Sequence, residues 1–342
     1  MAGRRWWVGA DLAIDLGTAS TLIHRQGEGI VLDEPTVVAL DAASGALVAA
    51  GSRAKEMLGR TPGTMRAVRP LRHGVVSDPD VTEQMLRYFT DQVGISRVLR
   101  PRMVICVPSE VTGVERRAVE EAALRVGARS VYLVEEPVVA AIGAALPVTD
   151  TQASVVVDIG GGSTDAAILA LGGVVASRSA RVAGDALDEA ITQHVKSELS
   201  LLLGERSAEE VKIAVGSAYP LAQEHSTRVR GRDLLTGLPR TVELGSGQVR
   251  RAIDPPVRQI IDLVRALLDR CPPELSGDVL GRGVTLTGGG ALLPGLEARM
   301  QHELGVPVTA ATDPLRAVAR GVGRCVDDFA ALQPVLVDGH RF

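Results

Sequence analysis

The sequence has few aromatic residues, few cysteines and no long apolar segment. Aromatic residues make up 2% of the chain and hydrophobic residues 46%, so the cores must consist mainly of valine, leucine, isoleucine and alanine. The three scattered cysteines form neither a disulfide framework nor a cluster of metal ligands, which fits a reducing cytoplasm. No stretch approaches the roughly 18 apolar residues of a membrane span, and the first residues lack the apolar region of a secretory signal.

Basic residues are not in excess either, because the formal net charge of the 342 residues is -4 at pH 7. A protein that binds nucleic acid normally needs a basic face, so nucleic acid is not an expected partner. Charged residues make up 23% of the chain, an ordinary share for a folded soluble protein. The length is sufficient for two domains with cores of their own.

Two short stretches share one pattern: "LAIDLGTAS" at residues 12–20 and "VVVDIGGGSTD" at residues 155–165. In each, an apolar run ends in an aspartate, which is followed by glycine and small hydroxyl residues. A tight turn of this composition points consecutive backbone N–H groups into one concavity, where they can bind phosphate oxygens. The hydroxyl groups that can add donors are those of Thr18, Ser20, Ser163 and Thr164.

The two aspartates, Asp15 and Asp158, indicate a cation. A carboxylate beside phosphates would repel them, and Mg²⁺ can offset this repulsion while keeping several of its waters. We expect both side chains to hold those waters, one from each side. The sequence lacks the G-x-x-x-x-G-K-[ST] pattern of a P-loop. A Rossmann turn would open a helix, whereas "AAILALGGVV" reads as a strand.

The apolar patterns predict the same order of elements in both halves of the chain. In the first half, strands are predicted at 12–16, 21–24, 103–107 and 130–134, and helices at 81–93, 113–127 and 135–146. In the second half, a strand, a glycine turn and a strand precede a helix at about 185–203. Ser207 and Glu210 predict a capping box, and residues 217–247 a small β-rich insertion. Cys106 is expected to be an inert thiol inside a strand.

A third glycine turn, "TGGGALLPGLE", completes a set with "IDLGTAST", "VVDIGGGSTDAAIL" and "VYLVEEPVVAAIGAAL". With these motifs the chain resembles the actin, sugar kinase and Hsp70 superfamily, and within it the MreB/Mbl family of bacterial actins, from about Asp11 to Asp328. The resemblance implies an α/β fold of two similar actin-like (ribonuclease H-like) domains around a nucleotide cleft, each with a smaller inserted subdomain. The expected ranges are domain I at 1–150 with its insertion at about 32–80, domain II at 151–328 with its insertion at about 184–250, and a tail at 329–342.

The resemblance also implies a site for ATP/ADP and Mg²⁺. The matching residues are Gly17, Thr18, Ala19 and Ser20 in the first phosphate loop, Gly160, Gly161, Gly162, Ser163 and Thr164 in the second, Glu209, Glu210, Val211 and Lys212 beside the adenosine, and Gly288, Gly289, Gly290 and Ala291 over adenine and ribose. Asp15 and Asp158 match the carboxylates near Mg²⁺, and Glu136 matches the residue that orients the attacking water. The alternative role is that of an acid at a helix N-terminus that only complements the helix dipole. This alternative suits Glu135 better than Glu136. Ser20 and Asp165 depart from the family pattern, which leaves the rate of hydrolysis open.

The implied function is that of an ATP-dependent, filament-forming bacterial actin homologue with slow ATP hydrolysis, which directs cell shape and cell-wall synthesis. The expected partners are further copies of the chain, the cell-wall elongation machinery and the inner face of the cell membrane, where a cytoplasmic protein would be peripheral. Residues 1–10 are the expected membrane-binding segment, because Trp6 and Trp7 adjoin two arginines. Val98 and Leu99 match a second membrane-binding loop. The alternative is a small-molecule kinase of the same superfamily, which would need a general base and an acceptor pocket.

Overall fold

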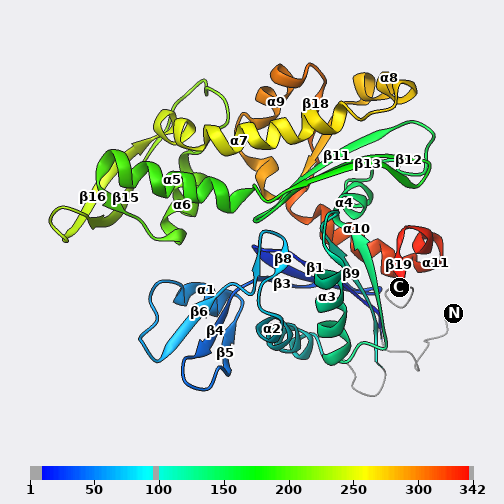
Figure 1. Ribbon diagram of the computed structural model, residues 1–342, viewed down its shortest axis with the longest axis horizontal. Coiled ribbons are helices and arrows are strands. Elements are labelled where there is room, and N and C mark those ends of the chain that lie inside the picture. Colours follow the sequence, from blue (N-terminus) through cyan, green and yellow to red (C-terminus); the bar gives the residue numbers. More distant parts are fainter. Residues whose placement is uncertain (1–9, 95–99, 339–342) are drawn as a thin grey trace. The chain divides into compact units, whose positions relative to one another are not determined.

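The computed structural model describes residues 10–94 and 100–338, and its internal contacts divide the chain into two compact units (Figure 1). Unit 1 comprises Met1–Asp150, Leu171–Val174 and Arg316–Phe342, and unit 2 comprises Thr151–Ala170 and Val175–Leu315. The predicted membrane residues Trp6, Trp7, Val98 and Leu99 lie outside the described residues. None of the described helices is long and apolar enough to cross a membrane.

Unit 1 is built on a six-stranded sheet in the order β19-β10-β9-β1-β2-β3. Its strands are β1 (Leu12–Leu16), β2 (Ser20–Arg25), β3 (Gly29–Pro35), β9 (Arg102–Val107), β10 (Ser130–Glu135) and β19 (Val337–Asp338). Strand β1 is antiparallel to β2 and parallel to β9, and β9 is parallel to β10. Both faces of these central strands are covered, which explains why their sequences are apolar throughout rather than alternating.

Helices cover the sheet of unit 1. They are α2 (Pro79–Gln92), α3 (Gly113–Arg125), α4 (Glu136–Gly143) and α10 (Ala317–Asp327). Because side chains alternate along a strand, Leu12, Ile14 and Leu16 of β1 point into one core, which includes Phe89 of α2 and Val119 of α3. Helices α4 and α10 pack on each other, and α10 also packs on β1 and β2.

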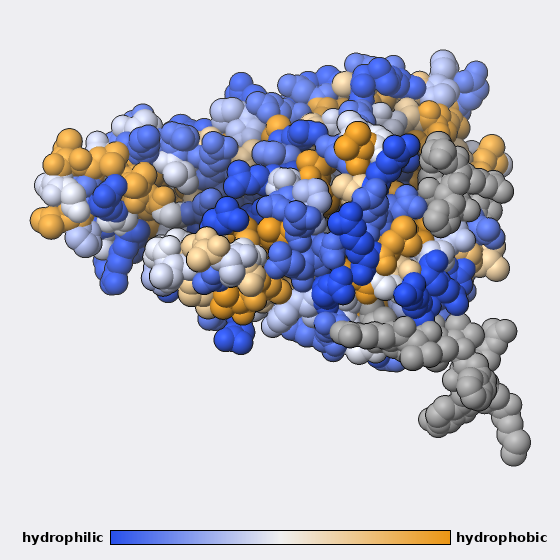
Figure 2. All heavy atoms as spheres, turned by 60° about the horizontal axis from the view of Figure 1, so that its bottom comes forward, coloured by the Kyte–Doolittle hydropathy of each residue, from blue (hydrophilic) through white to orange (hydrophobic). Residues whose placement is uncertain are grey.

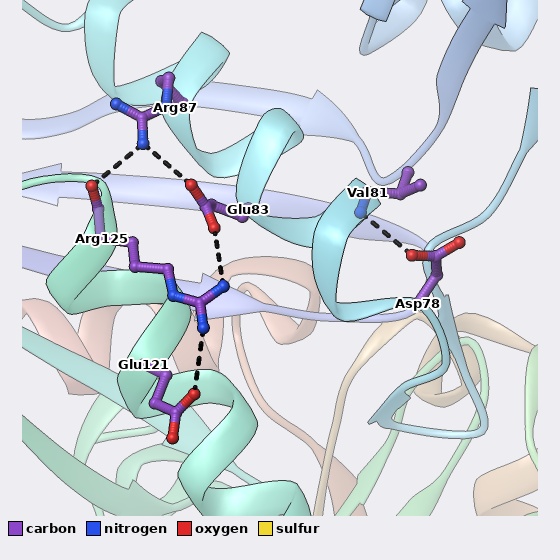
Figure 3. Close-up of polar contacts among 6 residues, drawn as sticks. All are labelled: Asp78, Val81, Glu83, Arg87, Glu121 and Arg125. Atoms are coloured by element: carbon purple, nitrogen blue, oxygen red, sulfur yellow. Dashed lines mark hydrogen bonds and ion pairs between the residues drawn. The ribbon is translucent and has the colours of Figure 1, made fainter. Parts of the chain in front are cut away.

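Ion pairs join α2 to α3 at the surface of this layer (Figure 3). Glu83 accepts hydrogen bonds from Arg87 at 2.9 Å and from Arg125 at 3.3 Å, and these arginines lower the pKa of its carboxyl, with the Arg87 hydrogen bond the largest cause. Arg125 also contacts Glu121 at 3.4 Å. Exposed pairs of this kind contribute little each, so the buried apolar contacts of the two helices contribute more to their packing on the sheet than these ion pairs do.

The contact between α4 and α10 explains why the end of the chain belongs to unit 1. A Cβ atom added at Gly143 would overlap the backbone of Ala317, and one at Gly321 would overlap the backbone of Val139. The two helices therefore touch backbone to backbone, which only glycine permits. The expected range of domain II extends to residue 328, whereas residues 316–328 belong to unit 1 by these contacts.

Residues 32–80 contain a small additional layer in unit 1. Its elements are β4 (Val38–Asp41), β5 (Leu47–Ala50), α1 (Ser52–Met57), β6 (Met65–Val68), β7 (Leu71–Arg72) and β8 (Val75–Val76). Strands β5, β4 and β6 form a three-stranded sheet. This sheet has a small core of its own, made of Val37, Ala39, Ala49 and Ala54.

Unit 2 repeats the sheet of unit 1. Its five-stranded sheet has the order β13-β12-β11-β17-β18, with β11 (Ser154–Ile159), β12 (Thr164–Ala170), β13 (Gly173–Ala180), β17 (Val284–Thr287) and β18 (Val308–Ala310). Strand β11 is antiparallel to β12 and parallel to β17, which is parallel to β18. The order β2-β1-β9-β10 of unit 1 has the same directions as the order β12-β11-β17-β18 of unit 2, so the predicted similarity of the two halves is confirmed.

The remaining α-helices and strands of unit 2 are α5 (Gly184–Leu199), β14 (Leu201–Leu202), α6 (Glu205–Val215), β15 (Ser226–Asp233), β16 (Pro239–Gly245), α7 (Ser246–Leu268), α8 (Pro273–Arg282) and α9 (Leu296–Leu304). The predicted β-rich insertion is present as the β15–β16 hairpin, whose exposed apolar residues are visible at the left of Figure 2. Helix α5 ends at Leu199, because Ser200 adopts a left-handed conformation with φ of 50°.

The predicted capping box at Ser207 and Glu210 is wrong. Helix α6 begins earlier, at Glu205 with Gly204 as its N-cap, so both residues lie inside the helix. Glu210 instead pairs with Arg206, one turn before it, at 3.0 Å. A capping box does occur at Thr112 and Glu115, where α3 begins.

Candidate functional site

The first predicted phosphate turn connects β1 to β2 in unit 1. The backbone N–H of Gly17 donates to the carbonyl oxygen of Ser20 at 3.1 Å, and a Cβ atom at Gly17 would lie 2.9 Å from that oxygen. Glycine is therefore required for the turn to close. Ala19 is exposed and Ser20 half-buried, but Thr18 is buried and its Oγ1 accepts a hydrogen bond from the N–H of Gly74 at 2.8 Å.

The second predicted turn connects β11 to β12 in unit 2 and has the same closing hydrogen bond. The N–H of Gly160 donates to the carbonyl oxygen of Ser163 at 3.0 Å. In both turns the glycine follows an aspartate by two residues, so the repeated sequence pattern produces a repeated backbone conformation. The Thr164 hydroxyl donates to the carbonyl oxygen of Val182 at 2.6 Å, which gives it a structural role.

The first residues of α5 adjoin the second turn. The N–H of Gly184 donates to the carbonyl oxygen of Gly160 at 3.1 Å, and that of Asp185 donates to Gly161 at 2.7 Å. Lys212 of α6 reaches the same place, since its Nζ donates to the carbonyl oxygen of Gly184 at 3.1 Å and to Asp188 at 2.8 Å. Lys212 therefore brings a positive charge close to the second turn.

Of the other predicted residues on α6, Glu209 is half-buried and Glu210 is exposed. Val211 is buried in the core of unit 2, so only its backbone is available to a ligand. Asp188, the partner of Lys212, has its pKa raised to about 6, chiefly by burial, although Lys212 acts in the opposite direction.

The third predicted segment, Gly288 to Ala291, packs against the end of β11. A Cβ atom at Gly288 would overlap the carbonyl group of Ile159, and one at Gly290 would overlap the Ile159 side chain. Ile159 immediately precedes the second turn, so unit 2 brings this loop, Lys212 and the turn together. Ala291 is buried, which again leaves its backbone rather than its methyl group for a ligand.

Asp15 lies at the carboxyl end of β1 and is half-buried. Burial raises its pKa to about 6, a hydrogen bond from the Cys106 thiol lowers it, and the charge of Asp33 raises it slightly further. The Sγ atom of Cys106 lies 3.4 Å from Oδ1 of Asp15. Burial and the charges of Asp15 and Glu136 keep the pKa of Cys106 well above its ordinary value, so the thiol is a proton donor.

Glu136 is the first residue of α4 and is only 8% exposed. Glu135, at the N-cap position, is half-buried and makes no side-chain capping hydrogen bond. Because the parallel strands β1, β9 and β10 all end at one edge of the sheet, Asp15, Cys106 and Glu136 are neighbours there. Sequence analysis identified the two carboxylates but regarded the thiol as inert.

Asp158 is the counterpart of Asp15 in unit 2. It is 5% exposed, and its Oδ1 accepts a hydrogen bond from the Thr287 hydroxyl at 2.7 Å. Among the described residues, no three or more His, Cys, Asp or Glu side chains group together to hold a metal ion. The aspartates nevertheless fit Mg²⁺, which takes few protein carboxylates and completes its coordination with phosphate oxygens and water.

Comparison with known sequences places these features in one family. A family model described as MreB/Mbl protein matches residues 9–334. The chain belongs to the MreB/Mbl family. The cell shape-determining protein Mbl of Bacillus subtilis (strain 168) is 47% identical over 323 residues, which cover 94% of this chain and 97% of Mbl. The cell shape-determining protein MreB of Escherichia coli (strain K12) is 49% identical over 323 residues, which cover 93% of each chain.

Solved structures of an MreB protein confirm the predicted actin-like fold. MreB5 of Spiroplasma citri bound to ADP is 34% identical and gives a TM-score of 0.89 over 95% of this chain and 97% of its own. The same protein bound to AMPPNP gives a TM-score of 0.90 over 94% and 97%. The repeated turns of this MreB/Mbl chain thus lie in a fold that binds nucleotide in a relative.

Sequence reasoning missed Thr287 and assigned no role to Cys106, although each of them donates a hydrogen bond to one of the two aspartates of this MreB/Mbl chain. Both belong to short apolar strands, where a small polar residue reads as part of the core. Their position in the sequence could have identified them. Each lies in a strand that was predicted to lead into a turn or a helix of the candidate site.

Proposed function

We propose that this chain is an ATP-dependent, filament-forming actin homologue, and that one Mg·ATP is held by the phosphate turns of both units. The observation that carries the proposal is the repeated turn: Gly17 and Gly160 make the same closing hydrogen bond on equivalent strands. Two turns that each offer backbone donors and one carboxylate suit a single ligand with several phosphates and a metal ion. MreB5, which shares this fold, has been solved with ADP and with AMPPNP.

Each group of residues has a distinct part in the proposed binding. The N–H groups that follow Gly17 and Gly160 within the two turns donate to phosphate oxygens, and Lys212 contributes a positive charge beside the second turn. The loop from Gly288 to Ala291 bounds the nucleotide next to Ile159. Asp15 and Asp158 hold waters of the metal ion. When bound, Mg²⁺ would neutralise charge on the terminal phosphates.

Slow ATP hydrolysis is proposed to depend on Glu136. Its carboxylate is nearly buried at the edge of the sheet where Asp15 and Cys106 lie, whereas an acid that only complements a helix dipole has no need of burial. A carboxylate in this position can accept a proton from a water molecule and orient its lone pair. Binding of one ligand by residues of both units would favour those conformations of the chain in which both sets of residues reach it.

Assembly on the inner face of the cell membrane, and a role in cell shape with the wall-synthesis machinery, are proposed from the family. Mbl and MreB are both described as cell shape-determining proteins. If Trp6 and Trp7 insert at the headgroup level beside two arginines, one protomer gains on the order of 5 kcal/mol. That corresponds to a dissociation constant of about 0.1–1 mM, so only an assembled filament with many copies would bind tightly.

The direct test of the nucleotide site is binding of a fluorescent ATP analogue, with and without Mg²⁺, to the wild type and to Asp158→Ala. Asp158 is buried beside the second turn, so its loss should weaken binding mainly when Mg²⁺ is present. Glu189→Ala, at an exposed position on α5, serves as the control for removal of a carboxylate. Equal affinity of the Asp158 variant and the wild type for Mg·ATP would remove Asp158 from the site.

A further inference from the structure

Each aspartate of the candidate site has a hydrogen-bonding partner on the neighbouring parallel strand. In unit 2, the register of β11 and β17 places Asp158 opposite Thr287, and the Thr287 hydroxyl donates to Oδ1 at 2.7 Å. In unit 1, β1 and β9 pair with Ile14 opposite Ile105, so Cys106 takes the corresponding place beside Asp15. Its thiol lies 3.4 Å from Oδ1 of that carboxylate.

The hydrogen bond in unit 2 fixes the direction of the Asp158 carboxylate. Thr287 is fully buried, and its branched Cβ restricts χ1, so the hydroxyl has little freedom to turn away. With Oδ1 held, the other oxygen lies on the side of the turn, 3.9 Å from where a Cβ atom of Gly160 would be. The carboxylate thus presents one oxygen to the turn and binds Thr287 with the other.

The corresponding contact in unit 1 is weaker. A thiol is a poor hydrogen-bond donor, and the Cys106 thiol has two acceptors within reach, Oδ1 of Asp15 at 3.4 Å and the carbonyl oxygen of Ile14 at 3.8 Å, whereas the Thr287 hydroxyl donates to Asp158 at 2.7 Å. Short hydrogen bonds from a hydroxyl to a carboxylate are among the stronger ones in proteins. The two halves therefore place equivalent carboxylates at equivalent points but hold them with unequal strength.

We propose that Thr287 is a positioning residue for Asp158 and that Cys106 is its weaker counterpart for Asp15. Thr287 orients the carboxylate that holds the metal ion of Mg·ATP, so that unit 2 contributes more to metal affinity than unit 1. This inference rests on the proposed nucleotide site. It goes further by naming the residues that determine the affinity of that site for the metal ion. In this proposal both residues act on the ligand only through the aspartates that they position.

The test uses Thr287→Val, which keeps the shape of the side chain and removes the hydroxyl, and Thr287→Ser, which restores it. Thr285→Val is the matched control, because Thr285 lies two residues earlier on the same face of β17, opposite Val156. For each variant, the dissociation constant for ATP is measured in excess Mg²⁺ and in EDTA. Thermal unfolding of the ligand-free proteins reports any loss of stability.

Thr287→Val should weaken Mg·ATP binding by about tenfold or more and leave binding in EDTA within about twofold of the wild type. Thr287→Ser should restore most of the affinity, and Thr285→Val should behave as the wild type. Cys106→Ala should weaken Mg·ATP binding less than Thr287→Val does. If Thr287→Val fails to fold, Thr287→Ala at reduced temperature carries the same expectation.

Equal weakening with and without Mg²⁺ would show that Thr287 only supports the fold, and would overturn the inference. A larger effect of Cys106→Ala than of Thr287→Val would overturn the ranking of the two halves. Absence of Mg·ATP binding by the wild type would refute the proposed function itself. These results are distinct, so a failure can be assigned to the right claim.

Discussion

Replacing Asp15 by asparagine should stabilise the ligand-free protein while weakening its binding of Mg·ATP. Burial raises the pKa of Asp15 from 3.8 to about 6, so the folded state disfavours the charged form. The stabilising contribution of this group is complete below pH 3.8 and is lost as the pH rises through about 6. At pH 8 the ionised carboxylate therefore acts against folding.

The size of the effect follows from the pKa difference between 3.8 and about 6. That difference corresponds to about 3 kcal/mol, and because the Asp15 side chain is not fully buried we expect about 1–3 kcal/mol. Asp15→Asn should gain this free energy of unfolding at pH 8. The gain should be about 1 kcal/mol smaller at pH 5, where the wild-type carboxyl is largely protonated in the folded state.

The measurement is denaturant unfolding of the ligand-free wild type and variant between pH 5 and pH 8. Glu189→Gln, at an exposed position on α5, controls for the removal of one negative charge. Mg·ATP should then stabilise the wild type more than Asp15→Asn, because the variant has lost a carboxylate for the ion. An Asp15→Asn protein that is no more stable at pH 8, or whose gain does not change with pH, would refute the reasoning.

Three further substitutions test other parts of the account. Glu136→Gln should slow phosphate release by about 10²–10⁴-fold while ATP binding persists; unchanged release would reject Glu136 and make Glu135→Gln the next variant. Gly288→Ala should lower the free energy of unfolding by about 1–3 kcal/mol, because φ is 78° there and a Cβ atom would overlap Ile159; unchanged denaturant stability would contradict this. Trp6→Ala combined with Trp7→Ala should abolish co-sedimentation of assembled protein with anionic liposomes; equal co-sedimentation would leave Val98 and Leu99 as the membrane-binding residues.

Local features of the fold could be predicted from the sequence because they depend on neighbouring residues. The turn after Asp15 and the turn after Asp158 follow from glycine and hydroxyl residues that come directly after apolar runs. Both turns adopt the same closing hydrogen bond. The similarity of the two sheets was predictable for the same reason, since each begins with such a hairpin.

Features that depend on distant parts of the chain were not predictable. The hydrogen bond between Thr287 and Asp158 joins residues 129 positions apart, and it depends on which strand lies beside β11 and in what register. The contact of Gly143 with α10 similarly decides that the end of the chain joins unit 1. The false capping box at Ser207 has a local cause, because the helix could begin either before or after that serine.

Nucleotide-dependent assembly tests the central claim most directly. The protein is centrifuged with Mg·ATP, with Mg·ADP and without nucleotide, alongside Asp158→Ala, and the pellets are examined for filaments. We predict that Mg·ATP drives wild-type protein into the pellet as filaments and that Asp158→Ala stays in the supernatant. Wild-type protein that binds Mg·ATP but remains monomeric, and forms ADP only when a small-molecule acceptor such as a sugar is added, would contradict the account and identify a kinase.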